Sequence, residues 1–279
     1  MNGDRLKPAA PNSVTMLALM CGVSSLHMTL WGRWEAAVVC ILLASLFDFL
    51  DGKVARCLKV SSRFGAELDS LSDFVCFGVA PGFLMYNWSM PSALRPEALT
   101  GQLAATEATG MPWACALVLA VCCGARLARF NAMLDEEPLP CWRHFFTGVP
   151  APGGCWMLLS PAILSLALDA KGLSPAFATV LQNPWTGVFM LLFVGSLMAS
   201  RLPTISLKHL HVSRRHLPLV LAGLLLLVAF LVSNFWLAIG SLGILYIFTV
   251  PLTGWLFLRV REKYAKAAAS ALDGAAPKV

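Results

Sequence analysis

The sequence predicts an all-α, polytopic membrane protein with about eight transmembrane helices. Of its 279 residues, 58% are hydrophobic and 13% are charged, and the mean hydropathy is +0.71, whereas soluble domains carry about 25% charged residues. The apolar runs are continuous and do not alternate, which favours helices over a barrel. We therefore expect a single membrane domain over residues 1–279, with a polar segment at 1–10 and a basic tail at 259–279.

Each expected helix is bounded by polar or helix-breaking residues. Pro11, Asn12 and Ser13, which are typical of helix starts, open the first one. Linkers rich in small and polar residues separate the third span from the fourth and the fifth from the sixth. The last two spans carry no motif, so we expect them to serve mainly in packing, and we expect the tail to be frayed. The expected spans are 11–32, 35–57, 66–88, 111–133, 148–169, 185–200, 217–233 and 235–258.

The distribution of positive charge predicts the orientation of the bundle. An even number of spans puts both termini on one side, and that side then receives 18 of the 21 lysine and arginine residues. Only Arg33, Arg95 and Lys171 fall on the other side. The positive-inside rule places the richer side in the cytoplasm. The net charge of +6 follows from this topology, and we expect no nucleic-acid partner.

Four carboxylates lie where two neighbouring spans meet this cytoplasmic face. Asp48 and Asp51 come near the end of the second span, and Asp69 and Asp73 near the start of the third. A carboxylate at the centre of a membrane helix costs about 3 kcal/mol, and residues three or four apart share a helix face. Oxygen ligands in this arrangement suit Mg²⁺, which usually retains substrate phosphates in its shell. The pattern predicts one or two divalent cations and a phosphorylated substrate.

Residues around the carboxylates predict a site for that phosphate. Gly52 and Ala55 are small and leave room for a ligand to approach the backbone. Arg56 offers a planar fork suited to phosphate oxygens. Ser62 adds a hydroxyl in the connecting loop, and Gly65 lies where the amides of the next helix point toward an anion.

The nine cysteines include no Cys-x-x-Cys pair. We expect them to be free thiols that fill space among the helices.

The carboxylate motif resembles the signature of a known family. The pattern Asp48-x-x-Asp51-Gly52-x-x-Ala55-Arg56, eight residues, Gly65-x-x-x-Asp69-x-x-x-Asp73 is similar to that of the CDP-alcohol phosphotransferases, whose members displace CMP from a CDP-linked lipid or alcohol. The resemblance implies the fold of that family, a homodimer, and Mg²⁺ or Mn²⁺ bound by the four aspartates, with Asp73 also acting as general base. The residues then expected to contact the CDP-lipid are Pro11, Asn12, Ser13, Val14, Gly52, Ala55, Arg56, Ser62 and Gly65.

Four further blocks, at 64–81, 126–131, 146–152 and 200–208, resemble the membrane-embedded phosphatidylserine synthases of bacteria. This implies CDP-diacylglycerol and L-serine as substrates, a membrane-lipid environment and the bacterial inner membrane as location. The serine carboxylate would need a cation near the metal site. The candidates at cytoplasmic span ends are Arg126, Arg129, Arg201 and Lys208.

Three alternatives stay open from the sequence. The same chemistry could use another acceptor, such as choline, inositol or glycerol phosphate. The carboxylates could instead form the binding site of a divalent-cation transporter, although Arg56 then has no role, because a cation opposes cation binding. A catalytically silent membrane scaffold is the third reading.

Overall fold

The computed structural model describes residues 9–58, 62–89, 105–133, 145–169, 171–172, 180–200, 202–205 and 217–274. Helices account for nearly all of them, and each of the eight predicted spans corresponds to a helix or a continuous helical segment. The helices are α2 (Ala9–Leu30), α3 (Trp34–Leu58), α4 (Arg63–Asp73), η1 (Phe74–Val79), α5 (Ala80–Ser89), α6 (Ala105–Ala132), α7 (Ala151–Asp169), α9 (Pro184–Ala199), α10 (Leu217–Ser233) and α11 (Phe235–Gly274).

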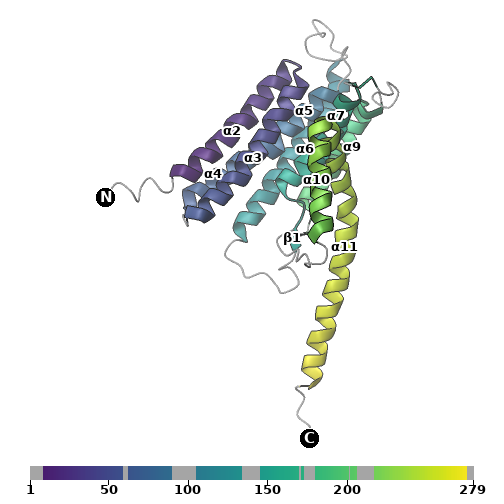
Figure 1. Cartoon of the computed structure of the whole chain (residues 1–279). Coiled ribbons are helices and arrows are strands. Elements are labelled where there is room, and N and C mark those ends of the chain that lie inside the picture. Colours follow the sequence, from purple (N-terminus) through teal and green to yellow (C-terminus); the bar gives the residue numbers. More distant parts are fainter. Residues whose placement is uncertain are drawn as a thin grey trace.

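The first two helices form an antiparallel hairpin that carries the carboxylate motif. Gly32 closes the turn between them with φ of 64°, a backbone conformation that favours glycine because it lacks a Cβ. Helix α4 packs against α2 on the same edge of the bundle (Figure 1). The third predicted span is one continuous helical segment, in which a six-residue π-helix, η1, separates α4 from α5.

The core lies where η1 and α5 meet α6, α7 and α9. Phe77 and Leu84, Leu119 of α6 and Leu158 of α7 are fully buried there. Small residues bring the helices close together, as in other membrane bundles. A Cβ added at Gly78 would lie 3.0 Å from Cys123 Cβ.

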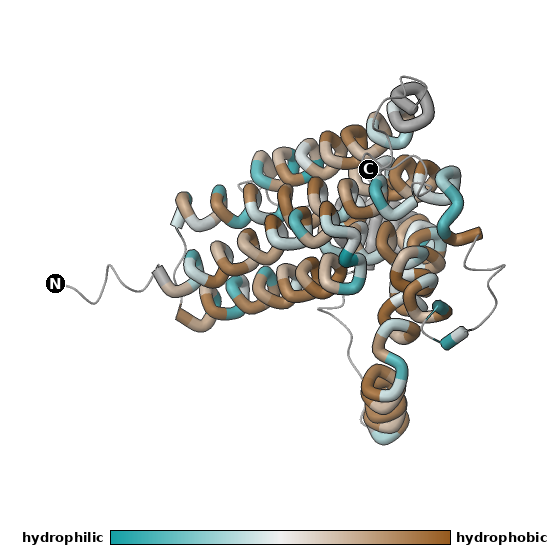
Figure 2. Tube along the Cα trace, turned by 90° about the horizontal axis from the view of Figure 1, so that it is seen from above, coloured by the Kyte–Doolittle hydropathy of each residue, from teal (hydrophilic) through white to brown (hydrophobic). Residues whose placement is uncertain are grey.

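The outer surfaces of the helices are apolar. Figure 2 shows hydrophobic residues along the helices, many large hydrophobic side chains are exposed, and the described side chains of α10 are exposed with few exceptions. A soluble monomer rarely exposes an apolar patch of that size. Five helical segments are long and apolar enough to cross a membrane, while α9 and α10 are shorter and α3 carries the charges of the motif. The protein is therefore a multi-pass membrane protein.

Two details differ from the sequence-based expectation. Short strands β1 (Phe145–Thr147) and β2 (Pro203–Ile205) pair antiparallel, with Phe145 opposite Ile205, where only loops were predicted. Gly148 follows β1 with φ of 79°, and its backbone N–H donates to the Leu202 carbonyl at 2.8 Å. Three-residue strands leave too little periodicity to be found in a sequence.

The C-terminal tail is the second difference. Helix α11 continues to Gly274 and extends well beyond the rest of the bundle (Figure 1), because its alanine-rich sequence has a high helix propensity.

Cys141 lies outside the described residues. The eight described cysteines are free thiols, as predicted.

Candidate active site

Three aspartates from two helices converge at one end of the hairpin. Asp48 and Asp51 lie in the last turns of α3, and Asp69 lies in α4. Each offers a carboxylate oxygen, and these oxygens all lie within 4.8 Å of one another. Asp51 is buried, with 5% of its surface exposed, and the other two are half-buried. Three carboxylates held so closely repel one another, and a cation bound between them would offset this repulsion; their all-oxygen donor set fits Mg²⁺ or Mn²⁺.

Asp73, the last residue of α4, completes the set of predicted carboxylates. Its carboxyl group is in hydrogen-bonding contact with that of Asp48. The π-helix η1 begins at the next residue, and such π-helical turns occur frequently at functional sites. The structure thus brings all four aspartates together, with Asp73 beside the triad.

Thr15 of α2 supports the cluster from the neighbouring helix. Its Oγ1 donates to Asp51 Oδ2 at 2.7 Å and also lies 3.1 Å from the Pro11 carbonyl oxygen. The hydroxyl of Ser72 donates to the Thr15 carbonyl at 3.4 Å. Sequence reasoning stopped at Val14 and missed Thr15. Its position one turn after Pro11, on a helix already assigned to the site, was the available signal.

The beginning of α4 brings three predicted ligand-binding residues together. Ser62 is the N-cap, and its Oγ accepts a hydrogen bond from the Gly65 backbone N–H at 3.0 Å. A Cβ added at Gly65 would lie 2.9 Å from Asn12 Oδ1 and 3.0 Å from Ser62 Oγ. The side chain of Asn12 therefore packs against the loop that precedes α4. Of its neighbours in α2, Pro11 is buried, Val14 is half-buried and Ser13 is exposed.

The backbone at Gly52, next to Asp51, has open space around it. A Cβ added at Gly52 would meet only Arg56 Nη2, at 3.9 Å. Arg56 is exposed and Ala55 is half-buried. This arrangement agrees with the expectation that small residues leave space beside the carboxylates and that an arginine borders that space.

The two arginines of α6 have different surroundings, although they were predicted to act as a pair. Arg126 lies within electrostatic range of Asp73 and of Tyr246 of α11, and its Nε is buried with no hydrogen-bond partner among the described residues. Arg129 instead donates from Nη1 to the Ala199 carbonyl at 3.0 Å, at the end of α9. The other two candidate cations, Arg201 and Lys208, lie outside the described residues.

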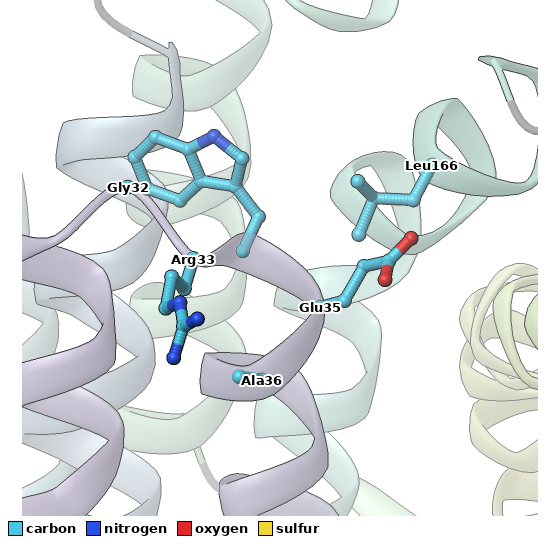
Figure 3. Close-up of a pocket in the computed structure, with 6 residues that line it drawn as sticks. Gly32, Arg33, Glu35, Ala36 and Leu166 are labelled. Atoms are coloured by element: carbon cyan, nitrogen blue, oxygen red, sulfur yellow. The ribbon is translucent and has the colours of Figure 1, made fainter.

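A cavity of about 400 Å³ lies elsewhere, at the turn between α2 and α3. In Figure 3, Glu35 points toward Leu166 of α7. Glu35 and Asp48 are separated along α3 by about 20 Å at 1.5 Å per residue, so this cavity is distinct from the carboxylate cluster. It is lined by Gly32, Arg33, Trp34, Glu35, Ala36 and Leu166.

Comparison with known proteins places the chain in a family. The family model described as CDP-alcohol phosphatidyltransferase matches residues 9–255. A Mycobacterium leprae protein named CDP-diacylglycerol–serine O-phosphatidyltransferase is 32% identical over 243 residues, which cover 86% of this chain and 73% of the relative. A Bacillus subtilis protein with the same name is 33% identical over 178 residues, covering 62% and 89% of the two chains.

An archaeal relative extends the comparison. The archaetidylserine synthase of Methanothermobacter thermautotrophicus is 34% identical over 146 residues, which cover 52% of this chain and 53% of the relative. The family match includes the helices that carry the four aspartates as well as α6, α7 and most of the membrane part of α11. The chain belongs to the CDP-alcohol phosphatidyltransferase family.

Proposed function

We propose that this transferase moves the phosphatidyl group of CDP-diacylglycerol to the hydroxyl of L-serine and releases CMP. The observation that carries the proposal is the convergence of Asp48, Asp51 and Asp69 within 4.8 Å, with Asp73 and Arg126 beside them. The names of the mycobacterial and Bacillus relatives support serine as the acceptor.

The three clustered aspartates would hold the divalent cation in this reaction. Bound Mg²⁺ or Mn²⁺ would offset the negative charge of the diphosphate and of the departing CMP. Thr15 fixes the orientation of the Asp51 carboxylate through its hydrogen bond. Arg56, at the border of the open space next to Gly52, is placed to bind phosphate oxygens through its guanidinium group.

Asp73 is our candidate for the general base. The serine hydroxyl oxygen would form a bond to the β-phosphorus, the phosphorus attached to diacylglycerol. The bond from that phosphorus to the oxygen bridging toward CMP would break, and its electron pair would leave with CMP. The hydroxyl proton would pass to the Asp73 carboxylate, which is half-buried beside Asp48. Positioned proton acceptors of this kind contribute about 10²–10⁴-fold to a rate.

We further propose that the site faces the cytoplasm of a bacterial inner membrane and that the enzyme is a homodimer. The excess of lysine and arginine in the sequence segments expected on the side of the termini supports the orientation, and the resemblance to the family supports the dimer. Labelling of single cysteines from either side of sealed vesicles would test the orientation. Light scattering of the detergent-solubilised protein would test the dimer.

Measurement of CMP release by purified protein tests the proposed function. The protein receives CDP-diacylglycerol with Mg²⁺ or Mn²⁺, and parallel reactions contain L-serine, choline, inositol, glycerol phosphate or no acceptor. We expect release that depends on both metal and serine. Release with a different alcohol alone would keep the reaction class and overturn the serine assignment. Metal uptake into sealed vesicles without CMP release would favour the transporter reading.

A further inference from the structure

The last helix places a tyrosine beside the candidate active site, although its sequence carries no recognised motif. Tyr246 lies in the membrane part of α11 and is half-buried. It lies within electrostatic range of Arg126, which in turn lies within electrostatic range of Asp73. Arg126 of α6 therefore lies near a carboxylate of α4 and near a tyrosine of α11 inside an apolar bundle.

Gly153 of α7 fixes the position of the tyrosine ring. A Cβ added at Gly153 would lie 2.8 Å from Cε1, 3.0 Å from the hydroxyl oxygen and 3.1 Å from Cζ of Tyr246. The hydroxyl end of the ring therefore rests directly on the α7 backbone, and any larger residue at 153 would displace it. Helix α11 packs along α7 over a long stretch, so the ring is carried by a rigid element.

Arg126 has a buried donor group that a bound ligand could pair with. Its Nε is buried without a hydrogen-bond partner among the described residues, and buried donors are rarely left unpaired. Within the described part of the chain, no hydrogen bond to the Tyr246 hydroxyl group is present either. The buried Arg126 Nε and the half-buried Tyr246 hydroxyl are thus two donors, one of them charged, and such a pair suits an anionic group with two acceptor oxygens.

The position of Arg126 near Asp73 favours one kind of anionic group. In L-serine, only two carbon atoms separate the hydroxyl oxygen from the carboxylate. When the hydroxyl of such an acceptor contacts Asp73, its carboxylate therefore also lies close to Asp73. Arg126 is the cation near Asp73 that could bind it. A choline or inositol acceptor has no carboxylate to offer at this point.

We infer that Arg126 and Tyr246 together bind the carboxylate of the acceptor, and that Tyr246 of the last helix determines specificity for a carboxylate-bearing alcohol. The inference rests on the proposed function and adds to it a residue from a helix that sequence reasoning assigned to packing. The Arg126 guanidinium supplies the charge, and the Tyr246 hydroxyl donates to the second carboxylate oxygen.

The principal test compares Tyr246→Phe with the wild-type enzyme in serine-dependent CMP release. Phenylalanine keeps the ring on Gly153 and removes only the hydroxyl. We expect the KM for L-serine to rise roughly tenfold or more, because a hydrogen bond to a charged group is lost, and the KM for CDP-diacylglycerol to stay unchanged. The preference for L-serine over ethanolamine, which lacks the carboxylate, should fall by the same factor.

A matched control comes from the same helix. The chain has three tyrosines, and Tyr264 lies in the same helix, about 27 Å beyond Tyr246 at 1.5 Å per residue. Tyr264→Phe should leave both KM values unchanged. Thermal unfolding of each variant checks that the fold is intact.

A second variant tests the geometry. Gly153→Ala pushes the ring from its position and should raise the serine KM in the wild-type background. In the Tyr246→Phe background the same change should have little further effect on serine KM, because the hydroxyl that it displaces is already absent. This non-additivity is what contacting residues show, and a merely structural role for Gly153 would give additive effects.

The possible outcomes separate the inference from the proposed function. If the wild-type enzyme uses serine and Tyr246→Phe matches it in serine KM and in acceptor preference, the inference fails while the proposed function stands. If the enzyme uses another carboxylate-bearing alcohol, the serine assignment fails; a raised KM of Tyr246→Phe for that acceptor then supports the inference, and an unchanged KM overturns it. An acceptor without a carboxylate, or no CMP release with any acceptor, overturns the inference along with the serine assignment.

Discussion

Thr15 on α2 donates a hydrogen bond of 2.7 Å to Asp51 on α3, so the first helix of the chain holds a carboxylate of the second. Both residues are buried, with 5% of each exposed. Hydrogen bonds of this type orient metal ligands, and their removal typically costs 10–100-fold in metal affinity or activity.

Replacing Thr15 with valine should therefore weaken the affinity of the site for the divalent metal. Valine keeps the shape of threonine and removes the hydroxyl, so Asp51 loses its donor. We expect the Mg²⁺ or Mn²⁺ concentration for half-maximal CMP release to rise by about tenfold or more. Thr15→Ser keeps a hydroxyl and is the control. Equal metal dependence of the two variants would show that the hydrogen bond has no such role.

Replacing Asp73 with asparagine should abolish most of the activity. The side chain keeps its size but cannot accept the hydroxyl proton, so we expect kcat to fall by about 10²–10⁴-fold. Asp169→Asn is a suitable control, because Asp169 is exposed at the end of α7 and accepts a hydrogen bond from Gln182 at 3.4 Å. If Asp73→Asn retains a near-normal kcat, another group takes the proton.

Divalent metal should stabilise the folded protein through the carboxylate cluster. A ligand that binds only the native state at 100 times its Kd adds about 2.7 kcal/mol to the free energy of unfolding. We expect Mn²⁺ to raise the thermal unfolding temperature of the detergent-solubilised protein, and a chelator to reverse the shift. The triple variant Asp48→Asn, Asp51→Asn and Asp69→Asn should show no metal-dependent shift. A shift of normal size in that variant would place the metal elsewhere.

Substitution by alanine should affect different properties at two glycines of the motif, the stability of the fold at Gly65 and the binding of CDP-diacylglycerol at Gly52. At Gly65 the new Cβ would lie 2.9 Å from Asn12 Oδ1, and overpacking of this kind costs about 1–3 kcal/mol. At Gly52 it would meet only Arg56 Nη2 at 3.9 Å, so folding should be unaffected while the KM for CDP-diacylglycerol rises. Thermal unfolding and CMP release separate the two effects. A normal KM in Gly52→Ala would indicate that the lipid does not approach the backbone there.

The two arginines of α6 should differ in the same measurements. Arg129 donates to the Ala199 carbonyl, so Arg129→Ala should lower the free energy of unfolding by about 1–2 kcal/mol with little change in serine KM. Arg126→Gln should mainly raise the serine KM. A large serine KM effect of Arg129→Ala would instead support its predicted role in binding the acceptor.

Much of this molecule can be predicted from its sequence, because the membrane allows few solutions. Backbone groups in lipid must be satisfied within the helix, so each long apolar run predicts a helix, and the eight expected spans match the observed helices. The spacing of Asp48, Asp51, Asp69 and Asp73 indicated their convergence, because three- and four-residue intervals put side chains on one helix face. The same spacing carried the family resemblance that the comparisons confirm.

Contacts between helices distant in the sequence were decided only by the tertiary structure. Thr15 and Asp51 meet because α2 and α3 pack as a hairpin. No spacing in the sequence pairs these two residues. Arg126 and Arg129 share a helix face by spacing, yet one lies beside Asp73 and the other at the end of α9, because different helices lie at the two positions. The ring of Tyr246 can lie against the α7 backbone because Gly153 has no side chain. Helical periodicity determines which residues share a face, and the packing of other helices against that face determines what each residue can do.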